Sequence, residues 1–212
     1  MFNQGETVQG WNDSPLTAKG LFEAECAGYG LKDIRFNKVY SGDANRQINT
    51  AKAFLKNNLY PTEIISDYHF REMCFGKYED GPYYDMLLPL YKAKNAPYKS
   101  YGGLYEYYDD IEIANTLASN DETGKTEGIE KTYKRFKQGL DEIVKENKNG
   151  NILISTSSIA IASVIYNLFP YQKLNGLVAN ASISIISYDG EYHLKEYNNI
   201  KYREIGEKHL SI

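Results

Sequence analysis

The stretch FNKVYSGDANRQINTAKAFLKN, residues 36–57, determines the fold class that the sequence predicts. Its first six residues are rich in apolar and aromatic side chains and predict a short strand, which a Gly-Asp turn ends. After the turn, Ile48, Ala51 and Phe54 recur at helical spacing, so a helix follows. Because a second short apolar run comes next, at residues 63–66, the sequence predicts a mixed α/β sheet with helices packed in layers.

The rest of the chain continues this alternation of helices and strands. Thr17 or Ser14 is the expected N-cap of a first helix. Residues 68–125 are rich in Tyr and Gly and strongly interrupted, which predicts a helical insertion that covers a site rather than a part of the sheet. The other predicted elements are helices near 82–94, 104–118, 126–148 and 159–169, a buried strand at 151–155, and a C-terminal β-hairpin over 182–197 that turns at Asp189 and Gly190.

Length and composition are those of an ordinary globular protein. The chain has 212 residues, 42% hydrophobic and 25% charged, with a formal net charge of −4, and we expect one domain over residues 1–212. The acidic balance disfavours a nucleic-acid partner, and no apolar run reaches the roughly 18 residues of a membrane span. Two Cys and no visible secretory signal favour a cytoplasmic, reducing compartment. Nothing in the composition predicts an oligomeric state.

No motif for a metal or a cofactor stands out, so none is expected. No Cys/His cluster has the spacing of a zinc site. Gly124, Lys125 and Thr126 are similar to the end of a phosphate-binding P-loop, but Ser119 stands where that loop needs its first glycine. We interpret them as a polar loop before a helix.

Five segments, in order along the chain, resemble the histidine phosphatase superfamily, also called the phosphoglycerate mutase-like family. The most specific is QGWNDSPLTAKG at residues 9–20. The others are residues 39–51 with Arg46, the block at 71–81, the strand at 151–155, and residues 180–183. The resemblance covers nearly the whole chain and implies a three-layer α/β/α fold with a mixed sheet.

This resemblance implies phosphoryl transfer through a histidine, with arginines around the phosphate and a carboxylic acid that protonates the leaving oxygen. It implies that Glu72 is the general acid. The expected partner is a small phosphorylated molecule or free phosphate. The residues that the resemblance places around the phosphate or the substrate are Asn3, Arg46, Arg71, Thr156 and Ser157.

The sequence departs from the family pattern at both positions that need an imidazole. Asn3 aligns with an asparagine that follows the family's Arg-His-Gly motif, so that motif and the central strand leading to it would lie before Met1. Thr156 stands where the second histidine should be. We therefore expect an inactive or severely impaired protein, either a pseudoenzyme or an N-terminally truncated form. We also expect that residues 1–8 do not fully replace the missing strand, so that the sheet has five strands or the N-terminal segment folds in as a poor surrogate.

Each candidate also has a structural interpretation. Arg46 could belong to an ion pair, Glu72 could be a solvated loop carboxylate, and the hydroxyl of Thr156 could cap the following helix. His69, three residues before Glu72, is a weaker candidate for a substitute imidazole. The alternative function is non-catalytic binding or scaffolding on the same fold, with the Tyr-rich region 83–108 as the partner surface.

Overall fold

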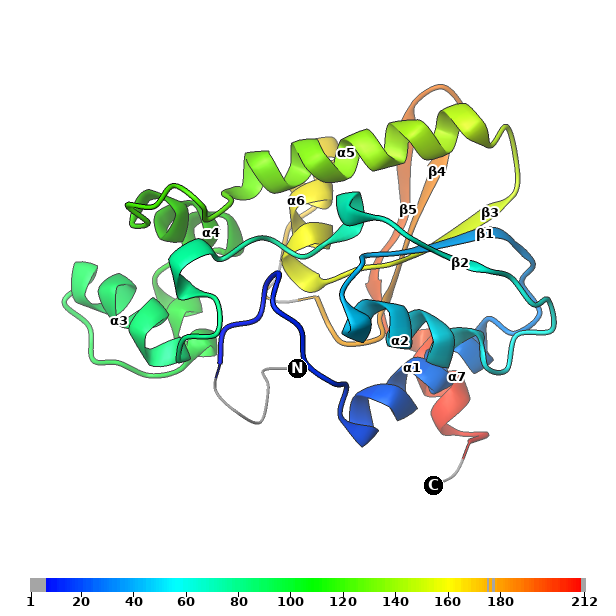
Figure 1. The fold of residues 1–212 in the computed structure, drawn as a ribbon, viewed down its shortest axis with the longest axis horizontal. Helices are drawn as coiled ribbons and strands as arrows, with labels where there is room; N and C mark the ends of the chain where they lie inside the picture. The colour runs from blue at the N-terminus through cyan, green and yellow to red at the C-terminus, as the bar shows by residue number, and fades with distance from the viewer. Residues whose placement is uncertain (1–6, 175, 177, 211–212) are drawn as a thin grey trace.

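A parallel sheet in the order β2-β1-β3 organises the larger part of the structure (Figure 1). The structure is a computed structural model, and it describes residues 7–174, 176 and 178–210. The strands of this sheet are β1 (Phe36–Ser41), β2 (Ile64–Ser66) and β3 (Asn151–Ser155). Because β1 is the middle strand, its Val39 and Tyr40 are only 0% and 6% exposed. The strand–helix–strand prediction for residues 36–66 is confirmed.

Helices cover both faces of this sheet, α1, α2 and α7 on one side and α5 and α6 on the other (Figure 1). Their bounds are Ala18–Gly30 for α1, Asn45–Leu55 for α2, Ile129–Glu146 for α5, Ser158–Leu168 for α6 and Lys201–Glu207 for α7. Val39 and Phe54 share an apolar cluster on the first side, and Tyr40 and Phe136 share one on the second. The three-layer α/β/α arrangement is therefore as expected. None of the helices in the described residues is both long and apolar enough to span a membrane.

In the helix layer that contains α1, the sequence predicts the start of α1 but not helix α7. The Oγ1 atom of Thr17 accepts a hydrogen bond from the N–H of Gly20 at 3.1 Å, which confirms Thr17 as the N-cap of α1. Helix α7 is absent from the predicted elements. It packs on α1 through Gly206, where an added Cβ would lie 2.1 Å from the carbonyl oxygen of Cys26. A larger residue at this position would push the two helices apart.

The C-terminal hairpin forms a second sheet of two antiparallel strands, β4 (Ile183–Tyr188) and β5 (Tyr192–Asn199). Gly190 in its turn has a φ of +117°, a conformation that glycine adopts without strain. In the described part of the chain, neither strand is hydrogen-bonded to the three-stranded sheet, so the five strands form two separate sheets rather than the expected single sheet of five. Residues 1–6 lie outside the described residues, and Thr7 forms an isolated bridge with Pro82 rather than a sheet strand.

A helical cap lies beside the sheet where the insertion is predicted (Figure 1). Its elements are η1 (Tyr68–Phe70), η2 (Gly76–Tyr78), α3 (Tyr83–Ala93), η3 (Tyr101–Glu106) and α4 (Asp110–Ser119). The second predicted helix, 104–118, starts too early because η3 occupies its first residues. Helix α4 begins after Asp109, which forms a capping box with Glu112.

Many of the cap's tyrosines contribute to its interior. Tyr91 and Tyr101 are 0% and 6% exposed and belong to the largest apolar cluster, with Tyr105 packed against it. Tyr84 and Tyr98 remain exposed and lie against each other, with ring centroids 4.8 Å apart. A partner surface over 83–108 therefore stays a prediction, with few aromatic side chains available to it.

Candidate active site

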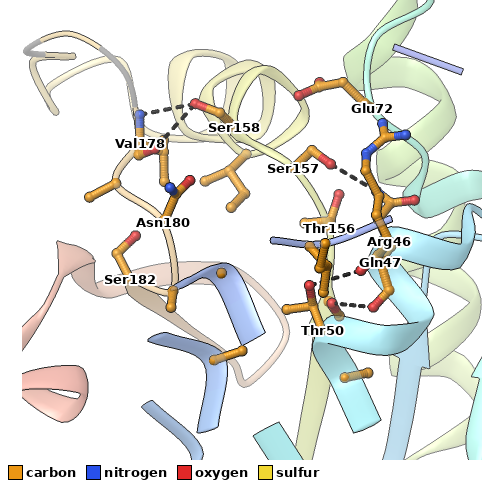
Figure 2. Close-up of a pocket in the computed structure, with 18 of the residues that line it drawn as sticks. Arg46, Gln47, Thr50, Glu72, Thr156, Ser157, Ser158, Val178, Asn180 and Ser182 are labelled. Atoms are coloured by element: carbon orange, nitrogen blue, oxygen red, sulfur yellow. Dashed lines mark hydrogen bonds between the residues drawn. The ribbon is translucent and has the colours of Figure 1, made fainter. Parts of the chain in front are cut away.

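A cavity of about 330 Å³ opens at the carboxyl ends of β1 and β3, between the sheet and the cap (Figure 2). Such crevices at the carboxyl ends of parallel strands are where α/β proteins bind ligands. The cavity is lined by the start of α2 with Arg46, the start of α6 with Thr156 and Ser157, and the cap residue Glu72. The sequence-predicted residues Arg46, Glu72, Thr156 and Ser157 therefore lie around one cavity.

Arg46 lies in the first turn of α2 and is held by the loop that precedes α1. Its guanidinium donates hydrogen bonds to the carbonyl oxygens of Gly10 and Asn12. The Asp13 carboxylate lies 3.9 Å from the guanidinium and accepts the backbone N–H groups of Asn45, at 2.6 Å, and Arg46, at 3.1 Å. Burial alone would raise the pKa of Asp13, but these N–H donors and the positive charge lower it below its ordinary value. The ion-pair interpretation of Arg46 is thus partly correct, and the guanidinium still faces the cavity.

Glu72 is buried at the beginning of α6, and its exposed fraction is 6%. Its Oε1 accepts the backbone N–H groups of Met73 and Ala160 at 2.7 and 2.9 Å, and its Oε2 accepts that of Ile159 at 3.2 Å. Burial raises the pKa of Glu72 above its ordinary value of 4.5, against the opposing effect of the N–H donors and of Arg46. The interpretation as a solvated loop carboxylate is wrong. A carboxyl group that holds its proton above its ordinary pKa can serve as a general acid.

Thr156 and Ser157 contact the segments on either side of the cavity rather than capping α6. The Oγ1 of Thr156 donates to the carbonyl oxygen of Phe70 at 2.8 Å. The Oγ of Ser157 accepts from Nε2 of Gln47 at 3.0 Å, and Ser157 makes no side-chain capping bond although it occupies the N-cap position. The helix-cap interpretation of the Thr156 hydroxyl is therefore wrong, because the carboxylate of Glu72 takes the first N–H groups of α6.

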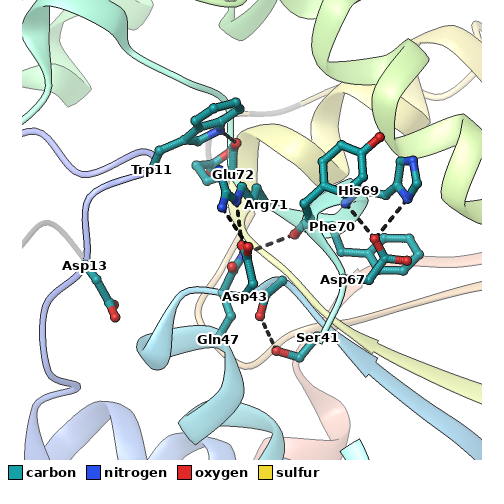
Figure 3. Close-up of polar contacts among 12 residues, drawn as sticks. Trp11, Asp13, Ser41, Asp43, Gln47, Asp67, His69, Phe70, Arg71 and Glu72 are labelled. Atoms are coloured by element: carbon teal, nitrogen blue, oxygen red, sulfur yellow. Dashed lines mark hydrogen bonds and ion pairs between the residues drawn. The ribbon is translucent and has the colours of Figure 1, made fainter. Parts of the chain in front are cut away.

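Two further candidates lie away from the cavity lining (Figure 3). Arg71 pairs through Nε and Nη2 with both oxygens of Asp43, at 2.5 and 2.6 Å, and its guanidinium stacks on the ring of Trp11 at 4.6 Å. That pairing holds the pKa of Asp43 below its ordinary value. His69 is 5% exposed, and its Nδ1 lies 2.9 Å from Oδ1 of Asp67. Neither side chain lines the cavity in the described residues, so a role for Arg71 in substrate binding stays a prediction.

Asn3, the remaining candidate, lies outside the described residues, and its predicted role near the phosphate stays a prediction.

A protein-family model matches most of the sequence that forms this sheet, cap and cavity. The family model described as the histidine phosphatase superfamily, branch 1, matches residues 1–97 and 104–200. The chain belongs to the histidine phosphatase superfamily.

Individual relatives of this histidine phosphatase chain differ in how much of it they match. A solved phosphoglycerate mutase from Bacillus anthracis str. Sterne has 30% identity and a TM-score of 0.86, covering 98% of this chain and 92% of that one. Fructose-2,6-bisphosphatase TIGAR B of Danio rerio is 39% identical over 84 residues, which is 38% of this chain and 33% of the relative. The match thus spans about a third of the length of that relative. A putative phosphoserine phosphatase 2 of Hydrogenobacter thermophilus is 21% identical over 200 residues, or 93% of this chain and 89% of the relative.

Arg135 is the clearest residue of the site region that the sequence analysis missed. It lies on α5, and its Nη1 and Nη2 donate to the carbonyl oxygens of residues 68, 69, 71 and 72 at distances from 2.9 to 3.3 Å. It also forms a buried pair with Glu127, with Nη2 2.8 Å from Oε2. Arg135 therefore fixes the segment that carries Glu72. Its signal in the sequence is that it is the single arginine in an otherwise lysine-bearing helix.

Glu79 and Trp11 hold the loop beside Arg46 and were also missed as individual residues. The Glu79 carboxylate accepts the backbone N–H groups of residues 10, 11, 12 and 75 at 2.9 to 3.2 Å. The indole N–H of Trp11 donates to the carbonyl oxygen of Glu72 at 3.0 Å. Both lie within segments that carry the family resemblance, but only the structure shows what they contact.

Proposed function

We propose that the cavity binds the phosphoryl group of a small phosphate ester, and that this chain transfers the group slowly or not at all. One observation carries both parts. Arg46, Glu72 and the first turn of α6 meet at the cavity, whereas none of the described residues that line it is a histidine.

Binding is supported by the donors that converge on the cavity. A guanidinium has five N–H donors, and the bonds of Arg46 to Gly10 and Asn12 leave others for an anion. Hydrogen bonds from an arginine to phosphate are charge-assisted and stronger than neutral ones. The N-terminus of α6, eleven residues long, adds its positive dipole end beside Glu72. When Glu72 is protonated, its carboxyl group does not repel the phosphate.

Impaired transfer is supported by the surroundings of Thr156, which stands where the family has its second histidine. Covalent phosphoryl transfer of this kind needs a nucleophile activated by a neighbouring base. The Thr156 hydroxyl donates to the carbonyl oxygen of Phe70, which is not a base. His69 is bonded to Asp67 and does not line the cavity. Glu72 retains the character of a proton donor for a leaving oxygen, but none of the described residues that line the cavity beside it is suited to attack phosphorus.

The cap limits the size and the chemistry of the ester. Phe75, Tyr83 and Tyr101 line the cavity from the cap. Burial raises the pKa of Tyr83 to about 12, with a further contribution from the charge of Glu72, so its hydroxyl stays neutral. Aromatic and neutral hydroxyl groups favour a small polar organic moiety on the phosphate. The names of the relatives, among them a fructose-2,6-bisphosphatase and a putative phosphoserine phosphatase, support esters of this size.

Calorimetric titration with inorganic phosphate tests the binding. We expect saturable binding that falls by about tenfold or more in Arg46→Ala, because a hydrogen bond to a charged group is lost. Arg35→Ala is the matched control, since Arg35 is an exposed arginine away from the cavity, and it should bind as the unchanged protein does. Equal binding by all three proteins would contradict the proposal.

A p-nitrophenyl phosphate assay tests the transfer. We expect no release of p-nitrophenolate above the buffer rate. Release that disappears in both Glu72→Ala and Arg46→Ala would show an active site and overturn this part of the proposal. Release that survives both substitutions would point to a contaminating phosphatase. Repurification to constant specific activity distinguishes such a contaminant from activity of this chain.

A further inference from the structure

The serine and threonine hydroxyls at the phosphate end of the cavity, where α2 and α6 begin, differ in which group takes their hydrogen. Four of them donate to backbone carbonyl oxygens, those of residues 46, 47, 70 and 178, at distances from 2.8 to 3.5 Å. These four hydroxyls belong to Thr50, Ser155, Thr156 and Ser158. A hydroxyl has one hydrogen, so these four side chains have none left for a ligand.

Ser157 lies among them and is bonded in the opposite sense. Its Oγ accepts a hydrogen bond from Nε2 of Gln47 at 3.0 Å (Figure 2). Within the described residues, the hydrogen of the Ser157 hydroxyl has no acceptor. Ser157 is half-buried and lines the cavity together with Arg46. At this end of the cavity, Ser157 therefore has a hydroxyl hydrogen available to a ligand.

The orientation of the Gln47 amide fixes which of the two groups donates. Gln47 is 3% exposed, and its Nε2 lies 3.1 Å from the carbonyl oxygen of Phe70. A carbonyl oxygen can only accept, so the amide must turn its NH₂ group, and not Oε1, towards Phe70. The second hydrogen of the same NH₂ group is donated to Oγ of Ser157. Ser157 is thus the acceptor in this bond and keeps its own hydrogen.

A phosphoryl oxygen would be the acceptor that the Ser157 hydroxyl lacks. Ser157 occupies the N-cap position of α6 but makes no capping bond, because the Glu72 carboxylate accepts the first N–H groups of that helix. An anion held by the Arg46 guanidinium would lie against both Ser157 and the start of α6. A hydrogen bond to a charged acceptor is stronger than one between neutral groups.

We propose that Gln47 is a positioning residue of the phosphate site, which orients the Ser157 hydroxyl as a hydrogen-bond donor to a phosphoryl oxygen. This rests on the phosphate binding proposed above and adds a second side-chain donor to Arg46. Such donors fit the unprotonated terminal oxygens of an ionised phosphate monoester. Oε1 of Gln47 is buried without a hydrogen-bond partner among the described residues, which costs stability. A side chain that is kept in spite of such a cost is typical of a functional site.

A double-mutant cycle on the full chain, measured by calorimetric titration with inorganic phosphate, tests the proposal. Ser157→Ala should weaken phosphate binding by about tenfold, and Gln47→Met by about fivefold. When Ser157→Ala is already present, Gln47→Met should weaken binding further by less than about twofold, because the hydroxyl that Gln47 orients is gone. A purely structural role of Gln47 would not produce this dependence on Ser157.

Two control variants should bind phosphate as the unchanged protein does. Ser157→Thr keeps a hydroxyl at the same position. Gln138→Met removes the amide of an exposed glutamine on α5, which donates to Oε1 of Glu142 at 3.2 Å away from the cavity.

NMR of the Gln47 side-chain amide keeps the proposal testable if Gln47→Met does not fold. The two hydrogens on Nε2 give separate proton resonances. In Ser157→Ala, the hydrogen that Ser157 accepts should move upfield, whereas the one bonded to Phe70 should stay in place. If neither resonance moves, the bond to Ser157 is absent and the proposal is overturned.

The titrations also separate this proposal from the phosphate site itself. If Gln47→Met weakens binding equally with and without Ser157→Ala, Gln47 has a structural role only and the proposal is overturned. If Ser157→Ala binds as the unchanged protein does while Arg46→Ala loses binding, the phosphate site stands and the role of Gln47 falls. Absence of phosphate binding by the unchanged protein would overturn both proposals.

Discussion

The cap and the sheet use similar apolar residues but bury them to different degrees. In the cap, Leu87, Leu90 and Leu104 are all 0% exposed. In β3, Leu153 is only half-buried. The cap satisfies its core with residues close in sequence, whereas the sheet depends on strands from distant parts of the chain. A local unit can therefore be fully packed while, among residues 7–174 and 178–210, no strand pairs with the second edge of β3.

Arg135→Ala should have the largest effect, because this side chain joins the two regions. It leaves the buried Glu127 carboxylate without its cationic partner and removes one hydrogen-bond donor from each of four carbonyl oxygens. We expect the free energy of unfolding to fall by about 4 kcal/mol. Urea denaturation measures it, with Lys134→Ala as the exposed control on the same helix. If Arg135→Ala loses no more than about 1 kcal/mol of unfolding free energy beyond the loss in Lys134→Ala, the role assigned to Arg135 is contradicted.

Leu90→Ala against Leu153→Ala measures the difference between the regions directly. Leu90 is fully buried in the cap, so its truncation should cost about 3 kcal/mol. Leu153 lines the cavity and is already partly exposed, so its truncation should cost about 1 kcal/mol. Denaturant unfolding of both variants checks the prediction. Equal losses would mean that the part of the cavity beside Leu153 is closed in solution.

Asp109→Ala should destabilise the cap by about 1 kcal/mol, because it removes the capping box at the start of α4. Asp109→Asn is the matched variant, since an asparagine side chain can still accept the N–H of Glu112. It should recover most of the loss in thermal denaturation. If Asn behaves as Ala does, the charge rather than the cap bond is responsible.

The smallest of these effects should be the contribution of Glu72 to the pH dependence of the unfolding free energy. Its pKa is raised in the folded protein above the ordinary value of 4.5, so the folded state binds the proton more tightly than the unfolded state. The stability that this contributes is complete below pH 4.5 and is lost as the pH rises through the folded pKa. Glu72→Gln should remove this decline from the curve of unfolding free energy against pH. An unchanged slope above pH 4.5 would contradict the raised pKa.

Local patterns predict the elements that are stabilised locally. The strand at 36–41, the N-cap Thr17 and the hairpin turn at Gly190 follow from hydrophobic spacing and turn chemistry, and the structure confirms each. Helix α7 has no such signal, because it is held by close packing on α1 through Gly206.

The sequence predicts which residues lie at the site where a family motif contains them. It does not predict the hydrogen bonds that these residues form with distant parts of the chain. Arg46 and Glu72 lie at the cavity as expected. The Glu72 carboxylate accepts the first backbone N–H groups of α6, and the Thr156 hydroxyl donates to the carbonyl oxygen of Phe70 instead. These contacts join residues more than eighty positions apart in the sequence. Arg135 is in the same situation, since its partners at 68–72 lie over sixty residues away.

Phosphorus NMR of p-nitrophenyl phosphate with a stoichiometric amount of protein tests the central claim most directly, because one spectrum reports both binding and transfer. We predict that the ester resonance shifts or broadens with the protein, that Arg46→Ala restores it to its free position, and that no inorganic phosphate resonance grows with time. An ester resonance that the protein leaves unchanged would contradict the binding site. A growing inorganic phosphate resonance that depends on Glu72 would contradict the predicted loss of transfer.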